Sequence, residues 1–231
     1  MKLIGLLGGM SWESTAYYYK ILNETVREML GGLHSARCVI YSVDFDEIEK
    51  CQADGDWDKS AEILAEAAQS LERAGADCIA ICTNTMHKVA PQIQDGISIP
   101  IIHIASETAR VLKDSGIGKV GLLGTKYTME QDFYKRVIME AGIDVIVPEE
   151  GDRQIVNEVI FSELCLGKVR DESRQEYLRI IGDLESKGAQ GVILGCTEIC
   201  MLVDSEVTNV PLFDTTEIHA KRLAEISIGG K

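Results

Sequence analysis

Ile4-Gly5-Leu6-Leu7-Gly8 and Val120-Gly121-Leu122-Leu123-Gly124 are two copies of one short apolar motif, 116 residues apart. Each copy precedes a helix-like segment with an aromatic pair, Tyr17-Tyr18 after the first copy and Phe133-Tyr134 after the second. Self-similarity at a fixed offset is the sequence signature of an internal repeat. The motif therefore predicts two related lobes.

Two further matched pairs follow in the same order. Gly75 to Thr83 matches Gly188 to Cys196, and Ile99 to His103 matches Val210 to Asp214. The offsets, 113 and 111, shrink slowly, as small loop deletions would make them. Chance explains one such pair but hardly three in one order. The alignment also places Thr83 opposite Cys196.

The repeat predicts an N-terminal lobe of residues 1–105 and 215–231, and a C-terminal lobe of residues 106–214. The tail is assigned to the first lobe because the helical pattern from Thr215 to Ile228 is long enough to return to it. The expected fold class is α/β, with two pseudo-symmetric lobes, each a mainly parallel sheet flanked by helices.

Six apolar runs are short and do not alternate with polar residues, which is typical of strands buried on both faces of a parallel sheet. They are Leu3–Leu7, Val39–Val43, Cys78–Cys82, Val120–Leu123, Val145–Val147 and Val192–Gly195. Helical patterns lie between them. One begins after Ser11, a good N-cap, and ends at Gly31-Gly32, and another runs from Asp58 to Ala74.

Composition excludes several classes of protein. The 231 residues are 45% hydrophobic, which is ample for a packed core, and the formal charge is −14. That charge argues against a nucleic acid or an anionic membrane as partner. No apolar run approaches the ~20 residues that a membrane helix needs, and the N-terminus resembles a first strand more than a signal peptide. We therefore expect a soluble, cytoplasmic protein whose seven cysteines stay thiols.

Ligands of open parallel sheets bind at the carboxyl ends of the strands. The residues expected there include the turn Gly8-Gly9-Met10-Ser11 and the segments beginning at Thr83, Thr125 and Cys196. The glycine turn has neither the dinucleotide spacing GxGxxG nor the GK[ST] ending of a P-loop, so it does not predict nucleotide binding. It is a tight turn before a helix, and whether the turn also binds a carboxylate is left open.

Cys196 follows a buried strand and precedes Thr197 and Glu198 at an expected helix start. A helix N-terminus lowers the pKa of a thiol below its usual ~8.5, so a thiolate base is one reading of this residue. A buried structural cysteine is the other.

Thr83-Asn84-Thr85 offers two hydroxyls and an amide, a set that suits a small polar ligand and equally suits a helix cap. His87 either orients a thiol or binds a carboxylate, or it is a capped surface residue or a hydrogen-bonded buried side chain. The cysteine spacings do not fit a structural zinc site, and we expect no metal.

These motifs resemble the cofactor-independent aspartate/glutamate racemase family, in particular its enterobacterial-type aspartate/glutamate racemase branch. The resemblance covers nearly the whole chain. Four segments carry it, namely Gly5-Leu-Leu-Gly-Gly-Met-Ser-Trp-Glu-Ser-Thr15, Cys82-Thr-Asn-Thr-Met-His-Lys88, Leu123-Gly-Thr-Lys-Tyr-Thr-Met129 and Gly195-Cys-Thr-Glu198.

The resemblance implies an amino-acid substrate in a cleft between two lobes, no pyridoxal phosphate, no metal, and a homodimer. In the family two cysteines act on opposite faces of the α-carbon, one as base and one as acid, which inversion through a planar carbanion requires. Oriented donors must stabilise that carbanion. The residues expected to bind substrate are Met10, Gln52, Asn84, Thr85, Thr125, Thr197 and Glu198.

The chain departs from this pattern at one catalytic position, because Thr83 stands where the family has cysteine. We therefore predict a catalytic pair of Thr83 and Cys196. A threonine hydroxyl is a far weaker acid than a thiol, so Cys196 is expected to serve as base for one enantiomer while turnover from the other is slow. Cys82 would replace Thr83 only if the strand ended one residue earlier, since neighbouring strand residues point to opposite faces.

The basic residues that hold the substrate's side-chain carboxylate in the family are not evident here. Gln52 and Lys168 stand in the regions where they are expected. This leaves open a racemase for aspartate and glutamate or a broad-range racemase for non-acidic amino acids. Two other readings stay open, namely a relative that uses one cysteine, such as a maleate isomerase, arylmalonate decarboxylase or hydantoin racemase, and a catalytically weak amino-acid-binding relative.

Overall fold

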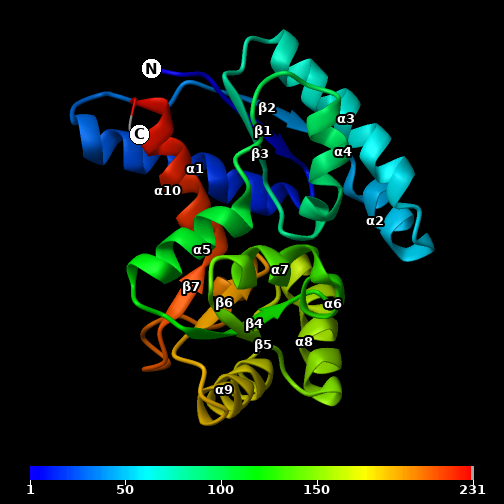
Figure 1. Cartoon of the computed structure of the whole chain (residues 1–231), viewed down its shortest axis with the longest axis vertical. Coiled ribbons are helices and arrows are strands. Elements are labelled where there is room, and N and C mark those ends of the chain that lie inside the picture. Colours follow the sequence, from blue (N-terminus) through cyan, green and yellow to red (C-terminus); the bar gives the residue numbers. More distant parts are fainter. Residues whose placement is uncertain (230–231) are drawn as a thin grey trace. The chain divides into compact units, whose positions relative to one another are not determined.

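A computed structural model describes residues 1–229, and it divides the chain into two compact α/β units (Figure 1). The first unit comprises Met1–Ile104 and Thr216–Lys231, and the second comprises Ala105–Thr215. Residues 230 and 231, the last two of the predicted N-terminal lobe, lie outside the described residues. Each unit is built around its own parallel sheet.

The sheet of the first unit has the strand order β2-β1-β3. The strands are β1 (Ile4–Gly8), β2 (Cys38–Ser42) and β3 (Cys78–Ile81), all parallel. Ile4 is paired with Cys38 on one side and with Cys78 on the other. Beyond β3, an isolated parallel bridge joins Ile79 to Ile101.

Both faces of this sheet are buried by helices. Leu7, Ile79 and Ile81 pack on one face with α3, while Ile4, Leu6 and Ala80 pack on the other with α1 and α10. The helical elements of the unit are α1 (Trp12–Leu30), α2 (Phe45–Asp54), α3 (Trp57–Arg73), η1 (Thr85–Val89), α4 (Ala90–Asp95) and α10 (Thr215–Ser227). The alternation of strand residues between two apolar layers explains why the strand sequences are apolar throughout.

The helix boundaries follow the cap residues in the sequence. The Ser11 hydroxyl accepts the backbone N–H of Ser14 at 3.2 Å, so α1 begins at Trp12. It ends before Gly31, which adopts a positive φ of 75°. The prediction for this helix is confirmed. The predicted helix from Asp58 to Ala74 is also confirmed, as α3.

The sheet of the second unit has the order β5-β4-β6-β7. The strands are β4 (Lys119–Gly124), β5 (Asp144–Ile146), β6 (Val192–Gly195) and β7 (Leu212–Asp214). The helical elements are α5 (Ile104–Asp114), α6 (Lys126–Glu130), α7 (Asp132–Glu140), α8 (Glu150–Ser162), η2 (Leu164–Leu166), α9 (Asp171–Ser186) and η3 (Ile199–Met201). Side chains of α8 and α9 form one core with Leu123, Val192 and Leu194.

The two sheets repeat one topology, as the sequence repeat predicts. β1, β2 and β3 occupy the same order as β4, β5 and β6, and the bridge from Ile79 to Ile101 corresponds to the pairing of Val192 with Leu212. The predicted α/β fold with two parallel sheets is confirmed, and each of the six predicted strands is found within one residue at both ends. Among residues 1–229, no helix is both long and apolar enough to span a membrane.

Candidate active site

In the first unit, β1 ends in a turn that only glycine can make. Gly9 has a φ of 92°, and a Cβ there would lie 2.2 Å from the carbonyl oxygen of Val43. The Thr15 hydroxyl accepts the Gly9 N–H at 2.9 Å and donates to the Ser11 carbonyl at 2.9 Å. This glycine turn is therefore held by side chains of the helix that follows it.

The carboxyl end of β3 is fixed against the same turn. The Cys82 N–H donates to the Leu7 carbonyl at 2.9 Å, and the Ser14 hydroxyl donates to the Cys82 carbonyl at 2.9 Å. The Cys82 side chain is fully buried in the apolar layer between the sheet and α1 and α10. Burial raises its pKa far above the ordinary thiol range, so Cys82 is an inert core residue in this structure.

Thr83, the next residue, is half-buried and lies outside the strand. Its backbone carbonyl accepts a hydrogen bond from the His87 ring, with a distance of 2.8 Å to Nδ1. Its hydroxyl has no hydrogen-bond partner within the part of the chain that the structure describes. The hydroxyl is therefore available to a ligand.

The other predicted binding residues of the first unit are buried around η1. Asn84 and Thr85 stand at the start of this 3₁₀ helix. Gln52, in the last turn of α2, donates its side-chain N–H to the sulfur of Met86 at 3.1 Å. Met10 belongs to the same apolar core as Met86. The structure thus brings Gln52 and η1 together, although they are more than thirty residues apart in the sequence.

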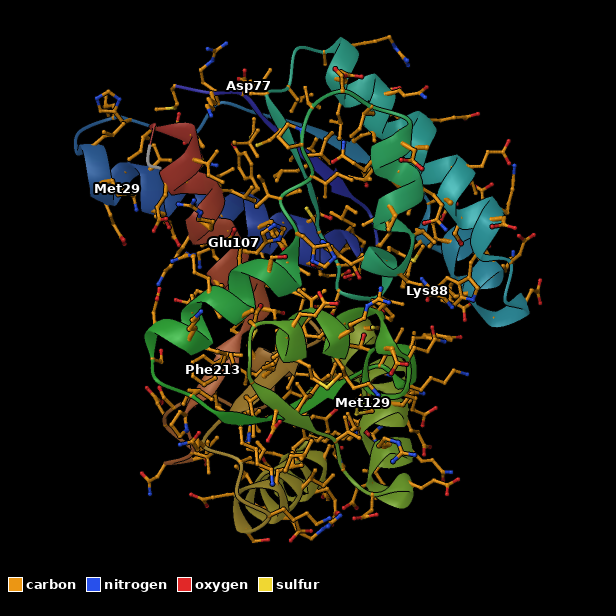
Figure 2. All side chains as sticks on the ribbon, viewed as in Figure 1. Met29, Asp77, Lys88, Glu107, Met129 and Phe213 are labelled. Carbon is orange, nitrogen blue, oxygen red and sulfur yellow. The ribbon has the colours of Figure 1, made fainter. Side chains whose placement is uncertain are left out.

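Lys88, also on η1, is a cation that sequence reasoning passed over, although it ends one of the quoted motifs (Figure 2). Its Nζ lies 3.6 Å from the centroid of the Trp57 ring, a cation–π contact. Burial lowers the pKa of Lys88. Among residues 1–229 its ammonium has no carboxylate within 4.0 Å, so no side chain there neutralises its charge by direct pairing. In a 3₁₀ helix, side chains three residues apart share one face, and Thr85 is three residues before Lys88.

In the second unit, Thr125 and Cys196 follow two residues that pair directly across the sheet, Gly124 and Gly195. They therefore lie at the same edge, at the carboxyl ends of β4 and β6. The Thr125 hydroxyl caps α6, accepting the Thr128 N–H at 3.4 Å. The predicted neighbourhood of these two residues is thus present within this unit.

Cys196, Thr197 and Glu198 form one hydrogen-bonded cluster. The Cys196 thiol donates to Oε2 of Glu198 at 3.0 Å, and the Thr197 hydroxyl donates to the same oxygen at 2.6 Å. Thr197 and Glu198 are buried. The Thr197 hydroxyl proton is already used in this bond, which leaves its backbone N–H as a donor for substrate. The role of Glu198 as acceptor for the thiol was not predicted; its only sequence signal is a glutamate two residues after the cysteine.

The expected lowering of the Cys196 pKa by a helix N-terminus is wrong. The segment after β6 is a short 3₁₀ turn, η3, which lacks the aligned peptide dipoles of an α-helix. Burial of the sulfur, and then the negative charge of Glu198, raise the pKa of Cys196 well above its ordinary value. The resting side chain is therefore a thiol, with its proton directed at a carboxylate.

Lys168, the other residue considered for a side-chain carboxylate, is exposed in the turn after η2. Its backbone N–H donates to the Glu163 carbonyl at 3.0 Å. Nothing in the second unit encloses its ammonium group. Of the two residues proposed for this role, Gln52 is buried beside η1 and Lys168 is not buried.

These features of the sequence and of the site can be compared with known proteins. The family model for Asp/Glu/hydantoin racemases matches residues 7–223. The chain belongs to this family. It is accordingly an isomerase of the amino-acid racemase type.

Two solved structures and one enzyme are similar in sequence to this racemase family member. A Yersinia pestis protein described as a candidate Asp/Glu racemase is 53% identical, with a TM-score of 0.92 over 99% of this chain and 100% of that one. An aspartate racemase homologue from Pyrococcus horikoshii is 38% identical, with a TM-score of 0.86 over 99% and 100% of the two chains. The broad specificity amino-acid racemase RacX of Bacillus subtilis is 26% identical over 95% of each chain.

Proposed function

We propose that this racemase acts on aspartate and glutamate, with Cys196 removing the α-proton of one enantiomer and Thr83 donating a proton on the opposite face. The observation that carries the proposal is the Cys196–Glu198 hydrogen bond of 3.0 Å, which gives the thiol proton an acceptor. The unpartnered hydroxyl of Thr83, at the equivalent position of the repeat, supports the assignment of the second group.

The proton steps balance with solvent. The Cys196 thiol passes its proton to Glu198, and the resulting thiolate takes the α-proton, so that Cys196 is a thiol again and the substrate is a carbanion. Thr83 donates its hydroxyl proton to the other face of the carbanion and regains one from water, while Glu198 returns its proton to water. The α-ammonium of the substrate assists the first step, because a nearby positive charge favours the thiolate. The proposed donors to the α-carboxylate are Asn84, Thr85, Thr125 and the backbone N–H of Thr197.

Exchange and inversion are separable in this scheme. Exchange of the α-proton with solvent needs only Cys196 and Glu198, because the Cys196 thiol can trade the abstracted proton for one from solvent and return that one to the same face. Inversion needs Thr83 as well. Thr83→Ala is therefore expected to keep exchange of the enantiomer that Cys196 deprotonates within about tenfold of the wild type, and to lower inversion by at least about 100-fold.

The measurement is α-proton exchange by NMR in D₂O, with L- and D-aspartate and L- and D-glutamate, alongside polarimetry for inversion. Thr83→Ser is the matched control, since it keeps the hydroxyl and should keep inversion. Equal exchange from both enantiomers in the wild type would overturn the asymmetric pair. No exchange from any of the four substrates would favour a binding protein or a different substrate class.

A broad-range racemase for non-acidic amino acids is the second candidate. It is favoured by RacX, named for broad specificity, and by the absence of a buried cation among the residues first predicted to bind substrate, where Gln52 is neutral and Lys168 is exposed. Lys88 bears on this choice, because its charge is not paired with a carboxylate in residues 1–229 and it lies on η1 with Asn84 and Thr85.

If the substrate is acidic, we expect Lys88→Met to raise KM for aspartate and glutamate about tenfold or more, because a hydrogen bond to a charged group contributes about 1.5–3 kcal/mol. KM for asparagine and glutamine should stay unchanged. Lys59→Met is the control, since Lys59 is exposed on α3 and pairs with Glu62. Equal KM changes for acids and amides would remove Lys88 from side-chain recognition. Turnover of neutral amino acids by the wild type at rates above those for the acids would establish the second candidate.

The homodimer and the cytoplasmic location expected from the sequence stay predictions. Light scattering of the purified protein measures the first.

A further inference from the structure

Two buried imidazoles in the first unit take no part in the proposed proton transfer. His87 on η1 is 2% exposed, and His219 on α10 is fully buried. The two rings lie 6.2 Å apart between centroids, and the ring of His103 lies 4.5 Å from that of His87. Buried polar groups are costly unless each is hydrogen-bonded, so their partners indicate what they hold in place.

The hydrogen bonds of His87 determine its tautomer. Nδ1 lies 2.8 Å from the Thr83 carbonyl oxygen, which can only accept, so Nδ1 carries the proton. Nε2 lies 3.2 Å from the backbone N–H of Ile104, which can only donate, so Nε2 carries the lone pair. Burial, together with the neighbouring rings of His103 and His219, keeps the imidazole neutral by lowering its pKa well below the ordinary value. The ring therefore links Thr83, two residues beyond β3, to Ile104.

His219 binds the same backbone segment, and its ring is in the other neutral tautomer. Its Nε2 lies 2.8 Å from the Ile102 carbonyl oxygen and so donates to it, while its Nδ1 accepts the hydroxyl proton of Tyr18 at 2.9 Å. Residues 102–104 are thus bound at a carbonyl by His219 and at an N–H by His87. Residues 102–104 are the last residues of the first unit before the chain enters the second unit at Ala105.

The orientation of Thr83 depends on this arrangement because the backbone hydrogen bonds between the strands do not extend to Thr83. β3 ends at Ile81, and η1 begins only at Thr85. The Ser14 hydroxyl holds the peptide group before Thr83 at the Cys82 carbonyl, and His87 holds the peptide group after it at the Thr83 carbonyl. The bond to His87 is therefore one of two anchors that set the direction of the Thr83 hydroxyl. A displacement of about 1 Å in a reacting group costs on the order of 100-fold in rate.

We propose that His87 is a positioning residue for Thr83: its Nδ1–H anchors the Thr83 carbonyl while its Nε2 fastens the ring to the Ile104 amide. This role rests on the proposed function of Thr83. It is distinct from orienting Cys196 or binding a carboxylate, because both ring nitrogens are already used by backbone groups.

Two substitutions separate the effects of the two hydrogen bonds that the His87 ring makes. His87→Asn places an amide N–H near the position of Nδ1 and keeps the bond to Thr83. His87→Gln places its amide near the position of Nε2, keeps the bond to Ile104, and loses the bond to Thr83. Each removes one buried hydrogen bond, and the smaller Asn also leaves a larger void than Gln, so thermal unfolding is measured for both variants.

The readout is the ratio of inversion to α-proton exchange, measured for the enantiomer that Cys196 deprotonates. We expect His87→Gln to lower this ratio about tenfold or more through kcat, with KM little changed, and His87→Asn to keep it within about threefold of the wild type. In a Thr83→Ala background, His87→Gln should lower the remaining inversion no further, because the two residues act as one unit.

Four results would overturn the proposal. If His87→Gln lowers exchange and inversion equally, its role is in general folding. If His87→Asn and His87→Gln lower the ratio equally, the bond to Thr83 is not what matters. If the wild type exchanges no amino acid, the proposed function and this role fail together, whereas wild-type exchange with an unaltered ratio in His87→Gln removes only the role of His87.

Discussion

Replacing Cys196 by alanine is expected to lower α-proton exchange of the preferred enantiomer by about 10³-fold, because the variant loses the base itself, and general base catalysis contributes about 10²–10⁴-fold. Exchange in D₂O followed by NMR measures the loss directly. The effect should exceed that of Thr83→Ala, because Thr83 is needed for inversion and not for exchange.

Cys200→Ala is the matched control for this variant. Cys200 lies in the same turn, is also half-buried, and donates its thiol proton to the Thr197 carbonyl at 3.2 Å. Burial and then Asp214 raise the pKa of its thiol, so it is no alternative base. We expect its removal to change exchange only a few-fold. Comparable losses in the two variants would mean that the turn is merely sensitive to cavities, and the assignment of Cys196 as base would fail.

Glu198→Gln tests the proton acceptor separately. The amide can occupy the same place beside the Cys196 thiol but cannot hold its proton, so exchange at neutral pH should fall about tenfold or more. The same change removes the negative charge that helps to raise the pKa of Cys196. The exchange rate of the variant should therefore recover as the pH rises and the thiolate forms without help. A rate that does not depend on pH would contradict the role of Glu198.

The strands and the repeat were predictable because each depends on a short local sequence pattern. Short apolar runs that do not alternate with polar residues predicted the six strands, because such runs are typical of strands buried on both faces. The strand ends at Ile81, one residue earlier than predicted, so both Cys82 and Thr83 lie beyond it. The Cys82 N–H nevertheless still bonds to the Leu7 carbonyl, and its side chain lies in the apolar layer between the sheet, α1 and α10.

The electrostatics of Cys196 were not predictable from the same patterns. A strand, a glycine and a polar triplet also precede many true α-helices, and nothing local distinguishes these from a 3₁₀ turn such as η3. The sign of the pKa shift then depends on where the Glu198 carboxylate points, which is a matter of side-chain rotamer. Likewise, the contact of His87 with Ile104 and the ring contact with His219 join residues far apart in sequence, and a single sequence carries no signal for them.

The histidine cluster has a second consequence, a loss of stability in mild acid. Burial lowers the pKa of His219 to about 3 and that of His103 to about 4, and it lowers the pKa of His87 as well. The unfolded chain takes up protons on these residues below its ordinary pKa of about 6.5, while the folded chain does not. Because the unfolded state then binds more protons, the free energy of unfolding falls as the pH decreases.

The expected decrease between pH 7 and pH 5 is about 2 kcal/mol for His219 and a similar amount for His103, from about 1.4 kcal/mol per pH unit below 6.5. His87 adds a decrease of the same sign. Urea unfolding at half-unit pH intervals measures the slope. His219→Gln keeps a donor near Nε2 for the Ile102 carbonyl but does not titrate, so its slope should be shallower by about 1.4 kcal/mol per pH unit. A wild-type stability that is constant from pH 7 to pH 5, or a slope that His219→Gln leaves unchanged, would mean that these imidazoles accept protons in the folded protein, and the neutral tautomers of His87 and His219 would have to be abandoned.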